Sequence, residues 1–275
     1  MLANLKDILS KAKAENYCVP ALGIGNEINF MACLEAAEEM HSPVIMLFMY
    51  GKNDIMRFGR WAREQAALAS VPVSITLDHG AEYEHAIQAI HAGFTDIMVD
   101  RSKLSFEENA AQVKELARIA HACGMGVEAE LGHVAMGDES VFTRPDEALA
   151  FVRETGVDAL AVAIGTAHGA YKDTPQLQFE LLEQLRDIVP VPLVLHGGSG
   201  TGDENLKKAC SMGINKLNVA YELYTGAIDS YRGYAESLSE QWRTWAPYDL
   251  YDKLGAGVKT VAEHHMELCG SVGKA

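Results

Sequence analysis

The stretch VPVSITLDHG, residues 71–80, reads as a buried strand that ends in chemically active side chains. Branched and apolar residues, which favour strands, continue as far as Leu77. Asp78, His79 and Gly80 follow at once. We therefore predict a strand whose end presents a carboxylate beside an imidazole, with a glycine where the chain turns away.

Similar short runs recur along the chain, each rich in branched or apolar residues and bounded by Gly, Pro, Asp or His. The predicted strands cover residues 19–24, 43–49, 71–77, 95–100, 126–131, 157–165, 191–197 and 214–220. Helical patterns lie between them, for example at 27–41 and 82–93, where apolar residues share one side. Residues 105–124 begin with Ser105, followed three positions later by Glu108, which is the pattern of a capping box.

Strands that are apolar throughout are buried on both faces, and alternation with helices indicates parallel pairing. Eight such units fit the size of a closed (β/α)8 TIM barrel, an α/β fold. A doubly wound open sheet is the alternative, but GIGNEI at 23–28 does not match its glycine-rich turn G-x-G-x-x-G. We predict one barrel domain over residues 1–275, in which about 221–275 form a barrel-closing helix and a C-terminal helical extension.

Composition excludes several classes of protein. Apolar residues make up 48% of the 275-residue chain, and the formal net charge of −15 argues against nucleic acid and membrane surfaces as partners, since their binders are basic. The five cysteines are scattered without a C-x-x-C pair, which predicts a reduced, cytoplasmic protein with neither a disulfide framework nor a cysteine zinc site. Residues 1–17 have the pattern of an amphipathic helix, not of a signal peptide, and no apolar run is long enough to cross a bilayer.

Polar residues follow the carboxyl ends of several predicted strands. In a barrel these ends share one face, and that face holds the active site. The residues concerned are Asp78, His79, Glu128, Glu130, His168, Lys172, His196 and Asn218. Two roles remain open for Asp78: a hydrogen-bonding partner of a metal ligand, or a group that moves a proton on a substrate hydroxyl.

Three of these side chains, His79, His168 and His196, come from three strand ends and each lies beside a glycine. Three imidazoles and an open position are the ligand set of a catalytic zinc ion. The alternative is that each histidine is simply hydrogen-bonded near a loop. His133, beside Glu130, is a weaker candidate ligand.

The segment HGGSGTGDENL, residues 196–206, is a glycine-rich loop that leads into a predicted helix. Backbone N–H groups exposed by glycine and a helix N-terminus together form an anion site, so we predict a bound phosphate. Lys172 would add positive charge. The alternative is a flexible loop with Asp203 as the cap of the helix.

Five motifs occur in one order: LDHG (77–80), VEAELG (127–132), VAIGTAHGAYK (162–172), PLVLHGGSG (192–200) and INKLNVA (214–220). Together they resemble the class II, zinc-dependent ketose-bisphosphate aldolases, the group of fructose- and tagatose-bisphosphate aldolases. The resemblance extends from about residue 17 to the C-terminus. It implies a lyase that reversibly cleaves a ketose phosphate or bisphosphate to dihydroxyacetone phosphate and an aldehyde.

The resemblance also implies roles for single residues. The implied ligands of one Zn2+ per chain are His79, His168 and His196, with Glu130 able to approach a displaced ion. Asp78 would be the acid/base for the hydroxyl at the cleaved bond, and Asn218 would hold the enediolate. The implied phosphate-side residues are Gly169, Lys172, Gly197, Gly198 and Ser199.

The chain departs from the family pattern on the aldehyde side. Its first strand ends in ALGIGN (21–26), and Met49 and Tyr50 stand where a small hydroxyl residue and a Pro-Gly turn are usual. Arg101 replaces a glycine, and Tyr221 takes the place of a phosphate-binding threonine. We therefore expect an altered aldehyde pocket that accepts a sulfonated or uncharged aldehyde, with Arg101 as a new anion contact and Tyr221 on the substrate.

The loop after residue 132 is short, and Glu139 or Asp138 would take the role of the proton-abstracting glutamate. A monovalent cation beside the phosphate is compatible with the resemblance, which also suggests a homodimer or homotetramer. Two other functions remain open: a zinc-dependent barrel enzyme of another class, such as a hydrolase, and a non-catalytic barrel that binds metal and phosphate.

Overall fold

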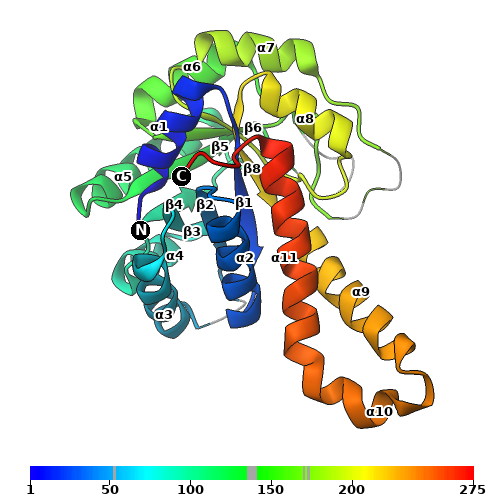
Figure 1. The fold of residues 1–275 in the computed structure, drawn as a ribbon. Helices are drawn as coiled ribbons and strands as arrows, with labels where there is room; N and C mark the ends of the chain where they lie inside the picture. Colours follow the sequence, from blue (N-terminus) through cyan, green and yellow to red (C-terminus); the bar gives the residue numbers. More distant parts are fainter. Residues whose placement is uncertain (52–53, 135–140, 170, 172–173) are drawn as a thin grey trace.

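The computed structural model describes residues 1–51, 54–134, 141–169, 171 and 174–275 (Figure 1). The strands in this part of the chain are β1 (Val19–Ile24), β2 (Val44–Met49), β3 (Val73–Gly80), β4 (Asp96–Val99), β5 (Gly126–Leu131), β6 (Ala159–Val162), β7 (Leu193–Leu195) and β8 (Ile214–Val219). They pair in parallel in sequence order, and β8 pairs with β1 to close the barrel. The predicted TIM barrel is confirmed, although β6 and β7 are shorter than their apolar runs.

Helices surround the barrel, close one of its ends and form a C-terminal arm. They are α1 (Leu5–Glu15), α2 (Glu27–Glu39), α3 (Ile55–Leu68), α4 (Tyr83–Ala92), α5 (Phe106–Ala122), α6 (Pro145–Thr155), α7 (Phe179–Ile188), α8 (Asp203–Ser211), α9 (Tyr221–Ser237), α10 (Trp242–Trp245) and α11 (Leu250–Cys269), with 3-10 turns at Ser239–Gln241 and Ala246–Asp249. The capping box of Ser105 and Glu108 is present at the start of α5. None of the described helices is both long and apolar enough to span a membrane.

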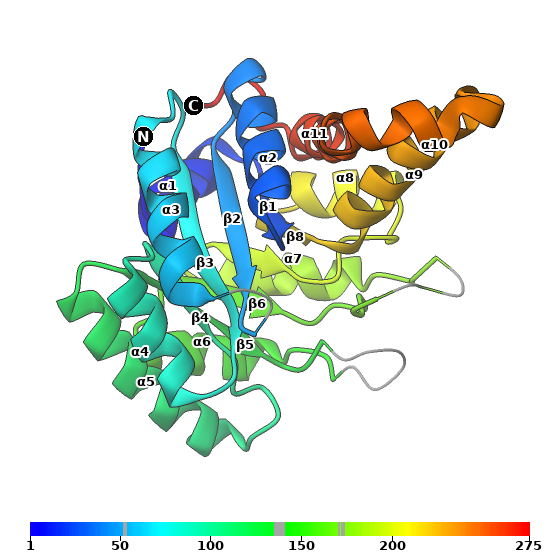
Figure 2. The ribbon, with the colours of Figure 1, turned by 90° about the horizontal axis from the view of Figure 1, so that it is seen from below.

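The C-terminal extension is built from α9, α10 and α11. These helices project from the barrel as an arm, and α11 then returns along α2 to bring the C-terminus back to the barrel (Figures 1 and 2). The expected helical extension is therefore present.

Strand β3 does not stop at Leu77 as expected but continues to Gly80, and its register against β4 shifts between these two residues. His79 has a φ of +48°, which is uncommon for a residue other than glycine. Adjacent residues of a regular strand point to opposite faces, whereas a bulge re-aims a side chain. The irregularity is what allows Asp78 and His79 to line the same cavity.

The other end of the barrel is closed by α1, which contacts β1, β3, β5 and β8. The buried Asp96 carboxylate joins this helix to the strands. Its Oδ1 accepts hydrogen bonds from the N–H groups of Leu5 (2.8 Å) and Gly126 (3.1 Å). Its Oδ2 accepts from the hydroxyls of Ser74 and Thr95, both at 2.6 Å.

Replacement of Asp96 tests this junction. Asp96→Ala removes an acceptor from four buried donors and leaves the N–H of Leu5 without a partner among the described residues. The other three donors have a second neighbour each, namely Thr95 O for Gly126, Ile75 O for Thr95 and the Thr76 hydroxyl for Ser74. We expect the free energy of unfolding to fall by about 2–4 kcal/mol. In Asp96→Asn the amide oxygen still accepts from the two N–H groups and the amide nitrogen donates to the two hydroxyls. We therefore expect a change of at most about 1 kcal/mol at pH 7.5. Equal losses in urea unfolding of the two variants would contradict this assignment.

The free energy of unfolding of the unchanged protein should depend on pH in a way that Asp96→Asn does not share. Burial raises the pKa of Asp96 from 3.8 to about 6, against the hydrogen bonds of Ser74 and Thr95, which lower it. The folded state therefore binds a proton that the unfolded state releases between about pH 4 and 6, and this stabilisation is lost as the pH rises through 6. Relative to Asp96→Asn, the unchanged protein should gain about 1 kcal/mol between pH 7.5 and pH 5.

Candidate active site

A cavity of about 470 Å³ lies at the carboxyl ends of the strands. Its lining includes the predicted catalytic residues Asp78 and Asn218 and two predicted ligands, His79 and His168. It also includes the predicted substrate-side residues Gly169, Gly197, Gly198, Ser199 and Tyr221. Side chains from separate strand ends therefore share one space.

The three predicted histidine ligands lie close together, and two of them, His79 and His168, line this cavity. One ring nitrogen each of His79, His168 and His196 lies within 4.8 Å of the others. Buried nitrogens of all three rings, Nε2 of His79, Nε2 of His168 and Nδ1 of His196, have no hydrogen-bond partner among the described residues. Unpaired buried nitrogens are costly, so a group that accepts three lone pairs is the simplest explanation of their convergence.

The second nitrogens of two rings are held by carboxylates. His79 Nδ1 lies 2.7 Å from Asp100 Oδ2, and Asp100 Oδ1 accepts hydrogen bonds from the backbone and hydroxyl of Ser102. His196 Nε2 lies 2.9 Å from Glu128 Oε1. Such contacts orient metal-binding imidazoles and increase their basicity.

The protonation of the rings depends on these neighbours. Burial and the two other histidines lower the pKa of His168 to about 4, so this ring is neutral. Burial also disfavours the charged form of His196, but Glu128 and Glu130 outweigh it and raise its pKa to about 10. Without a metal ion, His196 is thus an imidazolium between two carboxylates, and a bound cation would take over the position of that positive charge.

Glu130 lies where the resemblance places it. Its Oε2 is 3.1 Å from His196 Nδ1 without the geometry of a hydrogen bond, while Oε1 accepts from the N–H of Val134. Glu130 also has a carboxylate oxygen within 4.8 Å of His79 and Asp100 ligand atoms. Three imidazoles with a nearby carboxylate match the donor preference of zinc, so the residues fit a Zn2+ ion.

A buried ionic chain connects the histidines with Asp78. Residues two apart on a strand share a face, so Glu128 points into the barrel like Glu130. Lys216 Nζ lies 2.9 Å from Glu128 Oε2 and donates to Asn218 Oδ1 at 2.7 Å. Asn218 Nδ2 in turn donates to Asp78 Oδ1 at 3.4 Å.

Lys216 belongs to the site, although it is not among the residues predicted from the sequence. It is completely buried, which is rare for lysine and requires a partner charge. The available signal was its position two residues before Asn218 on the same strand, which puts both on one face. Because Lys216 occupies the amide oxygen of Asn218, the amide nitrogen is turned toward the cavity.

The glycine-rich loop fits tightly between the neighbouring loops. Gly197 has a φ of +68°, and a Cβ there would lie 2.4 Å from the carbonyl oxygen of Ala167. Ser199 Oγ accepts from the N–H of Ala220 at 3.2 Å, at the start of α9. The alternative interpretation of this loop required Asp203 as the N-cap of α8. The N-cap is instead Gly202.

The hydroxyl of Tyr171 joins this loop to the loop of His168. It accepts from the N–H of Ala167 at 2.6 Å and donates to the carbonyl of Ala167 or Gly197, at 2.7 and 3.0 Å. Tyr171→Phe removes these bonds, so we expect it to weaken zinc binding by about 10–100-fold through misplacement of His168. Competition with a chelator measures the affinity, and the exposed Tyr248→Phe is the control. Unchanged affinity in Tyr171→Phe would show that the hydroxyl does not position His168.

Arg101 does not line the cavity, contrary to its expected role as an anion contact. Its guanidinium is buried and donates to the carbonyl oxygens of Gly80 and Asp100, both at 2.9 Å, and to Gln112 Oε1 at 2.7 Å. These bonds hold it against the β3 bulge. Lys103, two positions later, lines the cavity instead and was not predicted.

Of the remaining predicted residues, some line the cavity, one points elsewhere and three lie outside the described part of the chain. Met49 lines the cavity, but the ring of Tyr50 turns away and stacks on His85, with 3.5 Å between ring centroids. His133 lines the cavity and lies 2.9 Å from the hydroxyl of Ser102, so it is a neighbour of the centre. Glu139, its alternative Asp138, and Lys172 lie outside the described residues.

Comparison with known proteins agrees with this geometry. Residues 3–274 match the family model of class-II fructose-bisphosphate aldolase. The chain is 39% identical to a fructose-bisphosphate aldolase of Thermus caldophilus and 36% identical to one of Geobacillus stearothermophilus, over all of this chain and 100% and 99% of theirs. The crystal structure of the YdjI aldolase from Escherichia coli K12 superimposes with a TM-score of 0.89 at 37% identity, over the whole of both chains. This chain therefore belongs to the class II fructose-bisphosphate aldolase family and is a metal-dependent aldolase.

Proposed function

We propose that this aldolase uses Zn2+ to cleave a ketose phosphate reversibly to dihydroxyacetone phosphate and an aldehyde. One observation carries the proposal: buried, unpaired ring nitrogens belong to three histidines that lie close together, two of which line the same cavity as Asp78 and Asn218. The glycine-rich loop on the same cavity is suited to the donor phosphate. A phosphorylated sugar is also the substrate class expected from the family.

In this proposal His79, His168 and His196 hold the ion. A bound Zn2+ polarises the ketone and stabilises negative charge on its oxygen. Asp78 accepts the proton of the hydroxyl at the breaking carbon–carbon bond and returns it to the aldehyde oxygen in the synthetic direction. Lys216 turns the amide nitrogen of Asn218 inward. That nitrogen donates a hydrogen bond to the oxygen of the dihydroxyacetone phosphate part of the substrate on which negative charge develops.

The aldehyde side supports a substrate different from fructose 1,6-bisphosphate. Leu47 and Met49 form an apolar wall from β2, and Arg101 is engaged elsewhere. Lys103 is an exposed cation on the same cavity. We infer that the far end of the ketose is uncharged or carries a single anionic group, such as a sulfonate, paired with Lys103.

Proton exchange tests the donor half without any aldehyde. The zinc-loaded protein is incubated with dihydroxyacetone phosphate in D2O, and exchange at C3 is followed by NMR. We expect exchange that disappears with chelator and in His79→Ala. Absence of exchange in a folded, zinc-loaded sample would contradict dihydroxyacetone phosphate as the donor.

A cleavage assay tests the aldehyde half. Fructose 1,6-bisphosphate is compared with ketose 1-phosphates whose far end is uncharged or sulfonated. The proposal expects a higher kcat/KM for one of the latter, and equal kcat/KM for the bisphosphate would contradict it. Lys103→Met distinguishes a ketose with an uncharged far end from one with a sulfonated far end. It should lower kcat/KM only where the far end of the ketose is anionic.

A further inference from the structure

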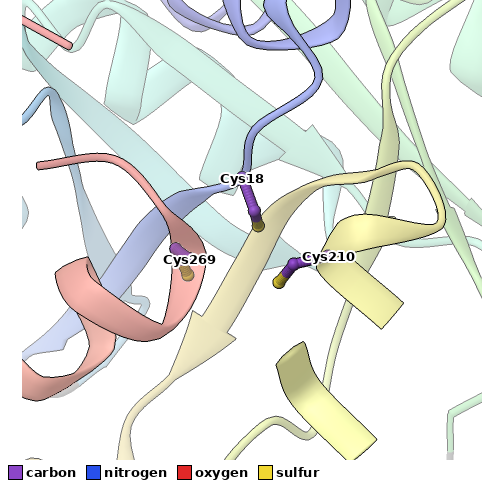
Figure 3. Close-up of side chains that lie close together, drawn as sticks. All are labelled: Cys18, Cys210 and Cys269. Carbon is purple, nitrogen blue, oxygen red and sulfur yellow. The ribbon is translucent and has the colours of Figure 1, made fainter. Parts of the chain in front are cut away.

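Three cysteine side chains meet in the interior of the protein, although they are far apart in the sequence. Cys18 directly precedes β1, Cys210 lies in α8, and Cys269 is the last residue of α11. Their sulfur atoms lie within 4.8 Å of one another, and Figure 3 shows the three side chains pointing into one space. The spacing of the cysteines predicts no cysteine zinc site and gives no sign of this cluster, because only the fold brings these residues together.

The arrangement is close to that required by one metal ion. Metal–thiolate bonds of about 2.3 Å in a trigonal plane place three sulfur atoms about 4 Å apart. The three sulfur atoms lie within 4.8 Å of one another, so at most a small inward movement of the side chains would reach this spacing. The backbone already ties two of the ligands together, since the N–H of Cys18 donates to the carbonyl of Cys269 at 3.0 Å.

The donor set selects the kind of ion. Sulfur is the only ligand atom in this group among the described residues, and the three side chains are buried, with exposed fractions of 0%, 5% and 2% for Cys18, Cys210 and Cys269. The nearby His265 is already engaged by the carbonyl of Val261 and by Glu222. Soft thiolates without a fourth ligand favour a monovalent copper ion over Zn2+, which prefers four ligands, and over Mg2+ or Ca2+, which require oxygen.

Packing alone is the competing explanation, because free cysteine is often buried as a small apolar residue. Cys33 represents that case: it is buried, outside the cluster, and burial raises its thiol pKa. The cluster differs from Cys33 in its geometry, because three sulfur atoms from separate parts of the chain lie within 4.8 Å of one another.

We propose that Cys18, Cys210 and Cys269 bind one Cu+ ion, separate from the histidine centre. Binding releases thiol protons as sulfur–copper bonds form, and no electron is transferred. The ion links the segment before β1 with α8 and with the end of α11, so it fastens the C-terminal arm to the barrel.

Copper binding is measured on reduced protein whose histidine site is filled with zinc. Cu+ is supplied without oxygen against a competing chelator, and a second sample is expressed in copper-supplemented cells. We expect one Cu+ per chain, sulfur-to-copper charge-transfer absorption in the ultraviolet, and a raised Tm. X-ray absorption should show a copper coordination shell of sulfur alone.

Cys210→Ala should weaken Cu+ binding by more than about 100-fold and abolish the rise in Tm, since even outer partners of a metal contribute 10–100-fold. Cys33→Ala is the matched control and should behave like the unchanged protein. Cys18→Ser and Cys269→Ser replace Cys210→Ala if it does not fold. Absence of copper from both samples, or equal binding by the cluster variants, would overturn the proposal. Proton exchange on dihydroxyacetone phosphate reports the active site independently.

Discussion

Asp78→Asn is expected to lower the rate of ketose phosphate cleavage by about 10²–10⁴-fold while the zinc-loaded protein still exchanges the donor proton of dihydroxyacetone phosphate. An amide cannot accept or return the proton of the hydroxyl at the cleaved bond. Its oxygen can still accept from Asn218 Nδ2, which now donates to Asp78 Oδ1 at 3.4 Å. The donor half of the site should therefore stay intact.

Two measurements on Asp78→Asn separate carbon–carbon bond cleavage from exchange of the donor proton. Steady-state cleavage gives kcat, and NMR in D2O gives the exchange rate. Loss of both activities at full zinc occupancy would assign Asp78 to the donor step or to the support of His79, the other role left open by the sequence. Retained cleavage would remove Asp78 from the chemistry. Asp100→Asn is a useful comparison, because Asp100 contacts His79 directly. This variant should lower the affinity for zinc instead of the rate of cleavage.

Lys216→Met is expected to lower the free energy of unfolding of the metal-free protein by about 3–5 kcal/mol. Methionine has a similar length, so little cavity is created. The loss arises because the buried carboxylate of Glu128, now 2.9 Å from Lys216 Nζ, keeps only His196 as a positive partner among the described residues, and Glu130 shares that imidazole. Asn218 also loses the donor that orients its amide, so donor-proton exchange should fall in parallel.

A double-mutant cycle checks the cause of that loss. Glu128→Gln removes the buried negative charge while its amide oxygen can still accept from His196 Nε2, so Lys216→Met with Glu128→Gln should recover most of the stability. Denaturant unfolding of the four proteins gives the coupling energy. Additive losses would mean that Lys216 contributes packing and not charge.

Much of this protein could be predicted from local patterns. The apolar runs located all the strands of the barrel to within a few residues, because strands buried on both faces are uniformly apolar. The three histidines and Asn218 could be assigned to one face because parallel strands of a barrel present their carboxyl ends together. Ser105 and Glu108 could be read as a capping box because that signal is entirely local.

The aldehyde side could not be predicted in the same way. Arg101 follows a strand end and carries the right charge, but its guanidinium turns to Gly80, Asp100 and Gln112. Lys103, two residues later in the same loop, reaches the cavity instead. The direction of a loop side chain depends on which hydrogen-bond acceptors the folded neighbours offer, and these are not adjacent in sequence.

The sequence by itself determined which residue types stand at the ends of the strands, and with them the barrel and its chemistry, since periodicity and strand-end position are local properties. Only the tertiary structure decided the three features on which the predictions depend. The β3 bulge turns Asp78 and His79 into one cavity, Lys216 neutralises Glu128 across the barrel, and Cys18 meets two cysteines from the other end of the chain. The bulge depends on how β3 pairs with β4, and the other two features are contacts between residues distant in sequence, so all three exist only once the barrel has closed.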